Sequence, residues 1–289
     1  MNASIYDKAL TQLPESIQAK LKQTFAEQPF TGQIPASIMA QFTSEQMPSL
    51  LSFAASFAIT PVSNFNVGAF VIGNSGAAYI GANLEFANQP LGQSVHAEQA
   101  AINNAWLANE TGIKQLYVNA SPCGHCRQFI REVAGQDSLT VQVLNHGSQS
   151  FPQLLPDSFG PQDLGNPYAL FEQQKQHFNT TTQDQPYQAI IAQANLSYAP
   201  YTGYYHSLGL QTVNGQWFIG RYAENAAYNP SLPALQSALS QLRFAGFSPT
   251  DIKAAVLAHR DEQKIDMTQQ YEMLLKQFNQ LELTVIKLN

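Results

Sequence analysis

The chain is organised around His96-Ala97-Glu98-Gln99 and Ser121-Pro122-Cys123-Gly124-His125-Cys126-Arg127-Gln128-Phe129. The second stretch holds both cysteines of the 289 residues. With His96, the two thiols offer three ligands to a tetrahedral Zn²⁺, which leaves the fourth position open for water, as a catalytic zinc site requires. Glu98 is close enough in sequence to act there as the catalytic acid and base. The sequence therefore predicts one catalytic Zn²⁺ per chain, held by His96, Cys123 and Cys126.

The spacing of His96 and Glu98 indicates where on a helix this site lies. Residues two apart on an α-helix point about 200° away from each other, so these side chains cannot share a site beside a regular helix. They can share one that lies off the N-terminal end of the helix. Ser94 is the expected N-cap of this helix, which we predict over residues 95–108.

The cysteine spacing indicates a second helix end. Residues three apart on a helix face the same way, so Cys123 and Cys126 can both point off the start of a helix that we expect to run to Gly135. A strand over 115–119 holds the two helices side by side. Two helix N-termini then point at one metal, and their positive ends stabilise the thiolates.

Composition describes an ordinary globular protein. Hydrophobic residues make up 44% and charged residues 12%, and the net charge of −6 argues against a nucleic-acid partner. We expect no membrane span, because no run of about 18 apolar residues occurs. The start of the chain lacks the basic and apolar regions of a signal peptide, and two cysteines cannot form a disulfide framework. A cytoplasmic location is the resulting expectation.

Alternating strands and helices predict a layered α/β fold with right-handed crossovers. The expected strands cover residues 67–73, 78–83, 113–119 and 139–144, with a hairpin turn over 74–76 and a loop or linker over 150–168. The expected domains are an N-terminal helical segment (1–45), a catalytic zinc domain (46–150), a linker that carries Phe159 (151–185) and a second domain (186–289).

The second domain repeats the first. An offset of 139 residues aligns Ile80-Gly81 with Ile219-Gly220, Glu85 with Glu224, and Ile113-Lys114 with Ile252-Lys253. One offset in separate stretches indicates duplication. After a two-residue deletion, Pro233 stands where His96 was, and no cysteine follows residue 126. The second copy is therefore expected to keep the fold without the metal ligands.

Each feature also has a plainer interpretation. A lone Cys-x-x-Cys can be a redox pair or half of a structural zinc site. His125 fits a loop position better than a fourth ligand. Phe65 can be core, and Asn83 and Glu85 can be polar groups at a strand end. The His-x-Glu stretch and the proline before Cys123 favour the catalytic interpretation.

The His96-Ala97-Glu98 and Pro122-Cys123-Gly124-His125-Cys126-Arg127-Gln128 stretches resemble the cytidine deaminase family, in its long homodimeric bacterial type with a degenerate second domain. The resemblance implies a duplicated three-layer α/β/α fold and the zinc-dependent hydrolysis of cytidine and 2′-deoxycytidine to uridine and 2′-deoxyuridine with release of ammonia, in pyrimidine salvage. Glu98 would exchange protons with cytosine N3 and with the leaving amine.

The resemblance also assigns the substrate contacts. It implies that Phe65 packs on the pyrimidine and that Asn83 and Glu85 bind the ribose 3′-hydroxyl. The Ala97 backbone would meet the base carbonyl, and the Ser121 carbonyl would lie near the leaving ammonia. Phe159 would reach across a homodimer to close the pocket of the neighbouring subunit.

Two rival functions stay open at this stage. A deaminase of nucleoside monophosphates or nucleic acid would need a basic patch, and none is apparent in the sequence. A structural zinc module would need a fourth protein ligand. The carboxylate of Glu85, expected to be buried, would accept a free 3′-hydroxyl and repel a 3′-phosphate, which favours a nucleoside substrate.

Overall fold

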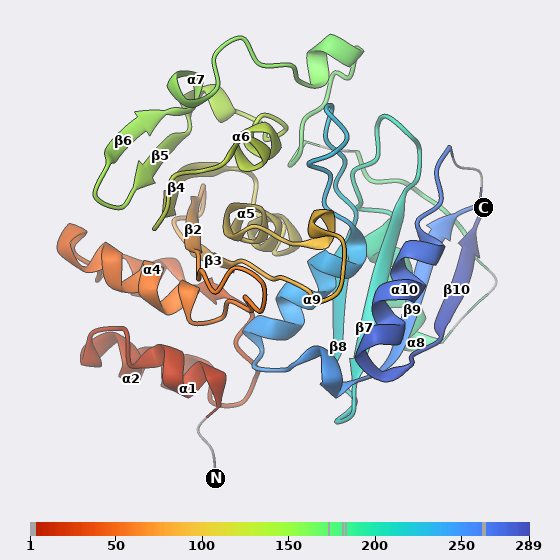
Figure 1. Ribbon diagram of the computed structural model, residues 1–289, viewed down its shortest axis with the longest axis horizontal. Coiled ribbons are helices and arrows are strands. Elements are labelled where there is room, and N and C mark those ends of the chain that lie inside the picture. The colour runs from red at the N-terminus through yellow and green to blue at the C-terminus, as the bar shows by residue number, and fades with distance from the viewer. Residues whose placement is uncertain (1–3, 173, 181, 183, 262–263) are drawn as a thin grey trace. The chain divides into compact units, whose positions relative to one another are not determined.

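The computed structural model describes residues 4–289 except 173, 181, 183, 262 and 263 (Figure 1). The chain divides into two compact units. The first holds the residues up to Phe159 together with Arg243–Gly246, and the second holds Gly160–Leu242 and Phe247–Asn289. Among the described residues, no helix has the length and apolar character needed to cross a lipid bilayer.

The first unit is built on a mixed six-stranded sheet. Its helices are α1 (Ile5–Leu10), α2 (Glu15–Thr24), α3 (Ala36–Met39), α4 (Met47–Ala55), α5 (Ala97–Leu107), α6 (Gly124–Ile130) and α7 (Phe151–Leu154). Its strands are β1 (Gln33–Ile34), β2 (Gly68–Gly73), β3 (Ala78–Ala82), β4 (Ile113–Val118), β5 (Thr140–Val143) and β6 (Gly147–Ser150). The strand order is β1-β3-β2-β4-β5-β6, in which β4 and β5 are parallel and the other neighbours are antiparallel.

Two glycines allow the layers of this unit to pack closely. A Cβ atom at Gly68 of β2 would lie within 2.5 Å of the α4 backbone, and one at Gly81 of β3 would lie 2.0 Å from Ala97 O of α5. Gly68 pairs with Ala82, the neighbour of Gly81, so the two glycines face opposite sides of the sheet. Figure 1 accordingly shows α4 and α5 on opposite sides of β2 and β3. The expected three-layer α/β/α arrangement is confirmed.

We predicted a helical segment over residues 1–45, but this segment also contains a strand. Gln33 and Ile34 form the edge strand β1, which pairs with Tyr79 and Ala78 of β3. A strand of two residues is too short to show a periodic pattern in the sequence, so it can be recognised only by its pairing with β3.

The stretch predicted as loop over 150–168 contains the helix α7. Its N-cap is Ser150, and the Gln153 side chain accepts a hydrogen bond from Ser150 N at 2.9 Å. This is half of a capping box, and Pro152 occupies the first turn, where proline fits. The signal was therefore present in the sequence and was outweighed by the surrounding prolines and glycines.

The predicted bounds of the two site helices also need correction. The N-cap of α5 is His96, not Ser94, because Val95 is still extended and bridges to Leu84. The helix after the cysteines ends at Ile130 rather than at Gly135. Both N-termini nevertheless lie where the ligand spacing requires them.

The second unit has a four-stranded sheet with the order β10-β9-β7-β8. Its elements are α8 (Gln185–Ala194), β7 (His206–Thr212), β8 (Trp217–Arg221), α9 (Ala234–Phe244), β9 (Ile252–Arg260), α10 (Thr268–Asn279) and β10 (Leu283–Leu288). β8 matches β3 residue for residue at the offset of 139, and α9 matches α5 after the two-residue deletion. β9 and β10 are parallel, as β4 and β5 are. The expected duplication is confirmed.

Candidate active site

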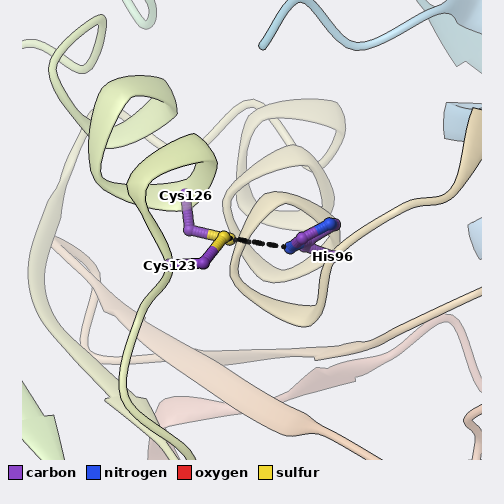
Figure 2. A group of neighbouring side chains, drawn as sticks. All are labelled: His96, Cys123 and Cys126. Atoms are coloured by element: carbon purple, nitrogen blue, oxygen red, sulfur yellow. Dashed lines mark hydrogen bonds between the residues drawn. The ribbon is translucent and has the colours of Figure 1, made fainter. Parts of the chain in front are cut away.

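Three side chains meet between the N-termini of α5 and α6 in the first unit. His96 is the N-cap of α5 and Cys123 the N-cap of α6, and Cys126 lies one turn further along α6. His96 Nδ1 lies 3.4 Å from Cys123 Sγ and 3.3 Å from Cys126 Sγ, and the two sulfurs are 3.6 Å apart. Figure 2 shows the imidazole and both sulfurs pointing at one another. Among the described residues, this is the cluster whose donor atoms can hold a metal ion.

The donor spacing fits Zn²⁺. Zinc bonds of about 2.3 Å to sulfur and about 2.0 Å to nitrogen, at tetrahedral angles, place two sulfur ligands about 3.8 Å apart and sulfur and nitrogen about 3.5 Å apart. The observed separations lie within a few tenths of an ångström of these values. Two thiolates and a neutral imidazole are also the donor types that zinc prefers over harder cations. The cluster therefore matches the three protein ligands of a catalytic zinc site.

The electrostatics of the cluster favour a cation. Hydrogen bonds from Cys126 and His96 lower the pKa of Cys123 to about 3, whereas the contact with Cys123 and burial raise the pKa of Cys126. The pKa of His96 is raised by its hydrogen bond to Cys123. Two thiolates at 3.6 Å repel each other, and a divalent cation between them removes that repulsion.

Glu98 lies beside the cluster. Its side chain is 4% exposed and hydrogen-bonds to the Cys126 thiol. Burial raises the pKa of Glu98 above the usual range of a carboxyl group. A buried carboxyl whose pKa is raised holds its proton more readily than an exposed one, which suits a group that passes protons to a substrate.

A pocket of about 330 Å³ opens next to this carboxylate. Its lining includes six of the residues predicted from the sequence: Phe65, Asn83, Glu85, His96, Ala97 and Glu98. Ser121 is exposed and lies outside this lining, two residues before Cys123. Ser63, Val67, Leu91, Ser94 and Val95 also line the pocket, and sequence reasoning gave none of them a place in it.

Glu85 is half-buried rather than buried, and most acceptor positions of its carboxylate already receive hydrogen bonds from nearby residues. Oε2 accepts hydrogen bonds from Val62 N at 3.0 Å and Ser63 N at 2.9 Å, and Oε1 accepts one from Ser63 Oγ. Partial burial alone would raise the pKa of Glu85, but these bonds lower it overall. A carboxylate has about four acceptor positions, so these three bonds leave about one for a further donor.

Asn83 also holds the pocket wall. Its Oδ1 accepts from Val67 N at 2.8 Å, and its Nδ2 donates to Phe65 O at 3.0 Å. An amide group has a second N–H that can point at a ligand. The Phe65 ring is 59% exposed at the rim of the pocket, so it is not the core residue of the plainer interpretation.

Phe159 belongs to a loop that is bound to α6. Gln128 Nε2 donates to Phe159 O at 2.8 Å, and Arg131 Nε donates to Ser158 O at 3.4 Å. The backbone is therefore held on the helix that carries the cysteines, while the Phe159 ring is 47% exposed.

In the second unit, side chains occupy the positions that match the pocket. Tyr204, His206 and Tyr222 correspond to Phe65, Val67 and Asn83 at the offset of 139. The His206 ring is fully buried and lies 4.2 Å from the Tyr204 ring and 4.5 Å from the Tyr222 ring.

The hydroxyl group of Tyr271 binds the N-terminal end of α9. Tyr271 Oη accepts from Ala234 N, the counterpart of Ala97, at 3.1 Å and contacts His206 Nε2 at 2.7 Å. The second copy thus holds packed rings at the positions that match Phe65, Val67 and Asn83 of the first unit.

Comparison with known proteins identifies the lineage of both halves. Two family models, each described as the cytidine and deoxycytidylate deaminase zinc-binding region, match residues 43–141 and 151–272. A cytidine deaminase of Vibrio parahaemolyticus is 41% identical over 280 residues, which cover 94% of this chain and 95% of that protein. Cytidine deaminases of Vibrio vulnificus and Photobacterium profundum are 42% and 40% identical, over 91% and 96% of this chain and 91% and 97% of theirs.

These matches run along nearly the whole chain, and they agree with the duplicated α/β fold and with the His96, Cys123 and Cys126 cluster that binds Zn²⁺. The chain is a long, two-domain member of the cytidine deaminase family.

Proposed function

We propose that this chain hydrolyses cytidine and 2′-deoxycytidine to uridine and 2′-deoxyuridine with release of ammonia, as a step of pyrimidine salvage in the cytoplasm. The catalytic domain covers residues 46–150, and residues 186–289 form its degenerate copy. The observation that carries the proposal is a three-ligand zinc cluster with a buried carboxylate, Glu98, at the wall of a pocket of about 330 Å³. Two free thiols in the cluster agree with a reducing compartment.

Zinc, when bound by His96, Cys123 and Cys126, supplies a water acidified for attack on C4 of the cytosine ring. Glu98 takes up the proton that this water loses and delivers it to N3 of the ring. Glu98 then takes the remaining proton of the hydroxyl group added at C4 and passes it to the departing amine, so that water and cytidine become uridine and ammonia. The raised pKa and the burial of Glu98 support both steps, because the same group must gain and lose a proton.

The pocket walls orient the nucleoside. The Phe65 ring stacks on the pyrimidine, and the backbone N–H of Ala97, in the first turn of α5 where N–H groups have no intrahelical partner, meets the base carbonyl. The open acceptor position of Glu85 and the second N–H of Asn83 bind the ribose 3′-hydroxyl. The Ser121 carbonyl receives the leaving ammonia.

Substrate choice tests this function. We expect turnover of cytidine and 2′-deoxycytidine and at least about tenfold lower kcat/KM for cytidine 3′-monophosphate and a cytosine oligonucleotide, because Glu85 repels a 3′-phosphate.

Glu85→Gln is expected to lower kcat/KM for cytidine by roughly 10- to 100-fold, since a charged hydrogen bond contributes about 1.5–3 kcal/mol. Loss of cytidine absorbance in the ultraviolet measures both. Unchanged cytidine turnover in Glu85→Gln, or a preference for the oligonucleotide, would exclude the proposed site.

We further propose a homodimer in which Phe159 of each subunit closes the pocket of the other. An exposed ring on a backbone held by Gln128 and Arg131 supports this, as do the exposed Phe65 and Leu91 at the pocket rim. Phe159→Ala is expected to raise KM for cytidine about tenfold, because an aromatic contact of 1–2 kcal/mol is lost. Light scattering measures the mass, and Met273→Ala, at an exposed position of α10, is the control. A fully active monomer would refute this arrangement.

A further inference from the structure

Ser63 joins two parts of the pocket wall through one hydroxyl group. Its Oγ donates to Glu85 Oε1 and accepts a hydrogen bond from Phe65 N at 3.0 Å. Its own N–H donates to Glu85 Oε2 at 2.9 Å. The hydroxyl proton is therefore committed to Glu85, so Ser63 is not set up to donate to a substrate.

The Phe65 ring depends on this link for its position. It is 59% exposed, so packing within the subunit does little to fix it. Asn64, the residue between Ser63 and Phe65, has a left-handed φ of 54°, which is uncommon for residues other than glycine. The Phe65 backbone is held at its N–H by Ser63 and at its carbonyl by Asn83. Loss of the Ser63 hydroxyl leaves one of these two anchors.

The second unit repeats the same link at the matching positions. Thr202 matches Ser63 at the offset of 139; its Oγ1 donates to Glu224 and accepts from Tyr204 N at 3.1 Å. Thr202 N donates to Glu224 at 3.2 Å. Gly203, which matches Asn64, again has a positive φ, of 75°. Both units therefore use the same hydrogen-bonded link, with serine in the first and threonine in the second. In the first unit this link holds Phe65, a residue of the pocket.

We propose that Ser63 is a positioning residue for the deamination: its hydroxyl holds Phe65 over the base, whereas Glu85 stays held by the backbone N–H groups of Val62 and Ser63. This inference rests on the proposed function. Phe65 contributes binding through stacking, so misplacing its ring weakens binding of the nucleoside more than it slows the chemical step at Glu98.

The kinetic constants of three variants test this assignment. Ser63→Ala is expected to raise KM for cytidine about tenfold with kcat changed less than about threefold, the cost of one lost hydrogen bond. Ser63→Thr is expected to restore KM, because threonine makes the same bonds in the second unit. Thr202→Val removes the matched hydroxyl and is expected to leave both constants unchanged. Zinc content is expected to stay at the wild-type level in all three.

A double-mutant cycle identifies the residue through which Ser63 acts. In a Phe65→Ala background, Ser63→Ala is expected to raise KM no further, because the ring it positions is gone. Additive effects on KM, an unchanged KM in Ser63→Ala, or an equal rise in Thr202→Val would each overturn the assignment. Should Ser63→Ala not fold, Ser63→Cys takes its place in the same cycle. If the wild-type protein does not turn over cytidine, the proposed function fails and not the Ser63 link.

Discussion

Replacing Glu98 by glutamine or alanine is expected to lower kcat for cytidine on the order of 10³-fold while zinc stays bound. Acid-base catalysis by a positioned side chain contributes about 10²- to 10⁴-fold, and in the proposed mechanism Glu98 protonates both N3 and the leaving amine. Its carboxylate is not one of the three metal ligands, so its loss leaves the metal site intact. Turnover is followed by cytidine absorbance, and zinc is measured in the same samples by elemental analysis.

The isosteric Glu98→Gln variant keeps the volume of the buried side chain, which separates loss of the proton carrier from a packing defect. Glu45→Gln, at an exposed position, is the matched control for removing one negative charge. Near-normal turnover in Glu98→Gln would show that another group moves the protons. Loss of zinc along with activity would instead make Glu98 part of the metal site.

Removing one thiol is expected to abolish both zinc binding and turnover. Cys126 is buried at the centre of the cluster, and Cys126→Ala leaves two ligands where a catalytic zinc site needs three. We expect kcat/KM to fall at least about 10⁴-fold, since the metal provides much of the 10⁶-fold or larger rate enhancement typical of enzymes. Zinc content and cytidine turnover are compared with those of His146→Ala, whose exposed side chain lies outside the cluster.

Removing zinc with a chelator is the reversible counterpart of removing a thiol ligand. A strong zinc chelator is expected to stop turnover in the wild-type protein, and added Zn²⁺ is expected to restore it, whereas Cys126→Ala does not recover. An active form in which Cys123 and Cys126 are joined by a disulfide would contradict the zinc site. Sulfurs 3.6 Å apart are well outside the disulfide bond length of about 2.05 Å.

The ligand set could be predicted because its geometry is local. The positions of His96 and Glu98 on one helix start, and of Cys123 and Cys126 on another, follow from the helical repeat within four residues. The structure confirms the start of the second helix at Cys123 and moves the cap of the first from Ser94 to His96. The duplication was equally accessible, since a constant offset between two stretches needs no three-dimensional information.

The hydrogen bonds that hold the pocket wall could not be predicted from the sequence, because they join residues that are far apart in the chain. Ser63 and Glu85 are 22 residues apart, and Asn83 and Phe65 are 18 apart. A serine one residue before an Asn-Phe pair is a weak turn signal that names no partner.

The sequence by itself determined the metal ligands, the position of Glu98 beside them and the repeated architecture, because each follows from residue identity at short or constant spacing. Only the tertiary structure decided which side chains wall the pocket, that β1 completes the sheet, and that Tyr204, His206, Tyr222 and Tyr271 fill the corresponding space of the second copy. Hydrogen bonds and ring contacts between distant residues depend on how the layers pack, and no periodic pattern records that packing.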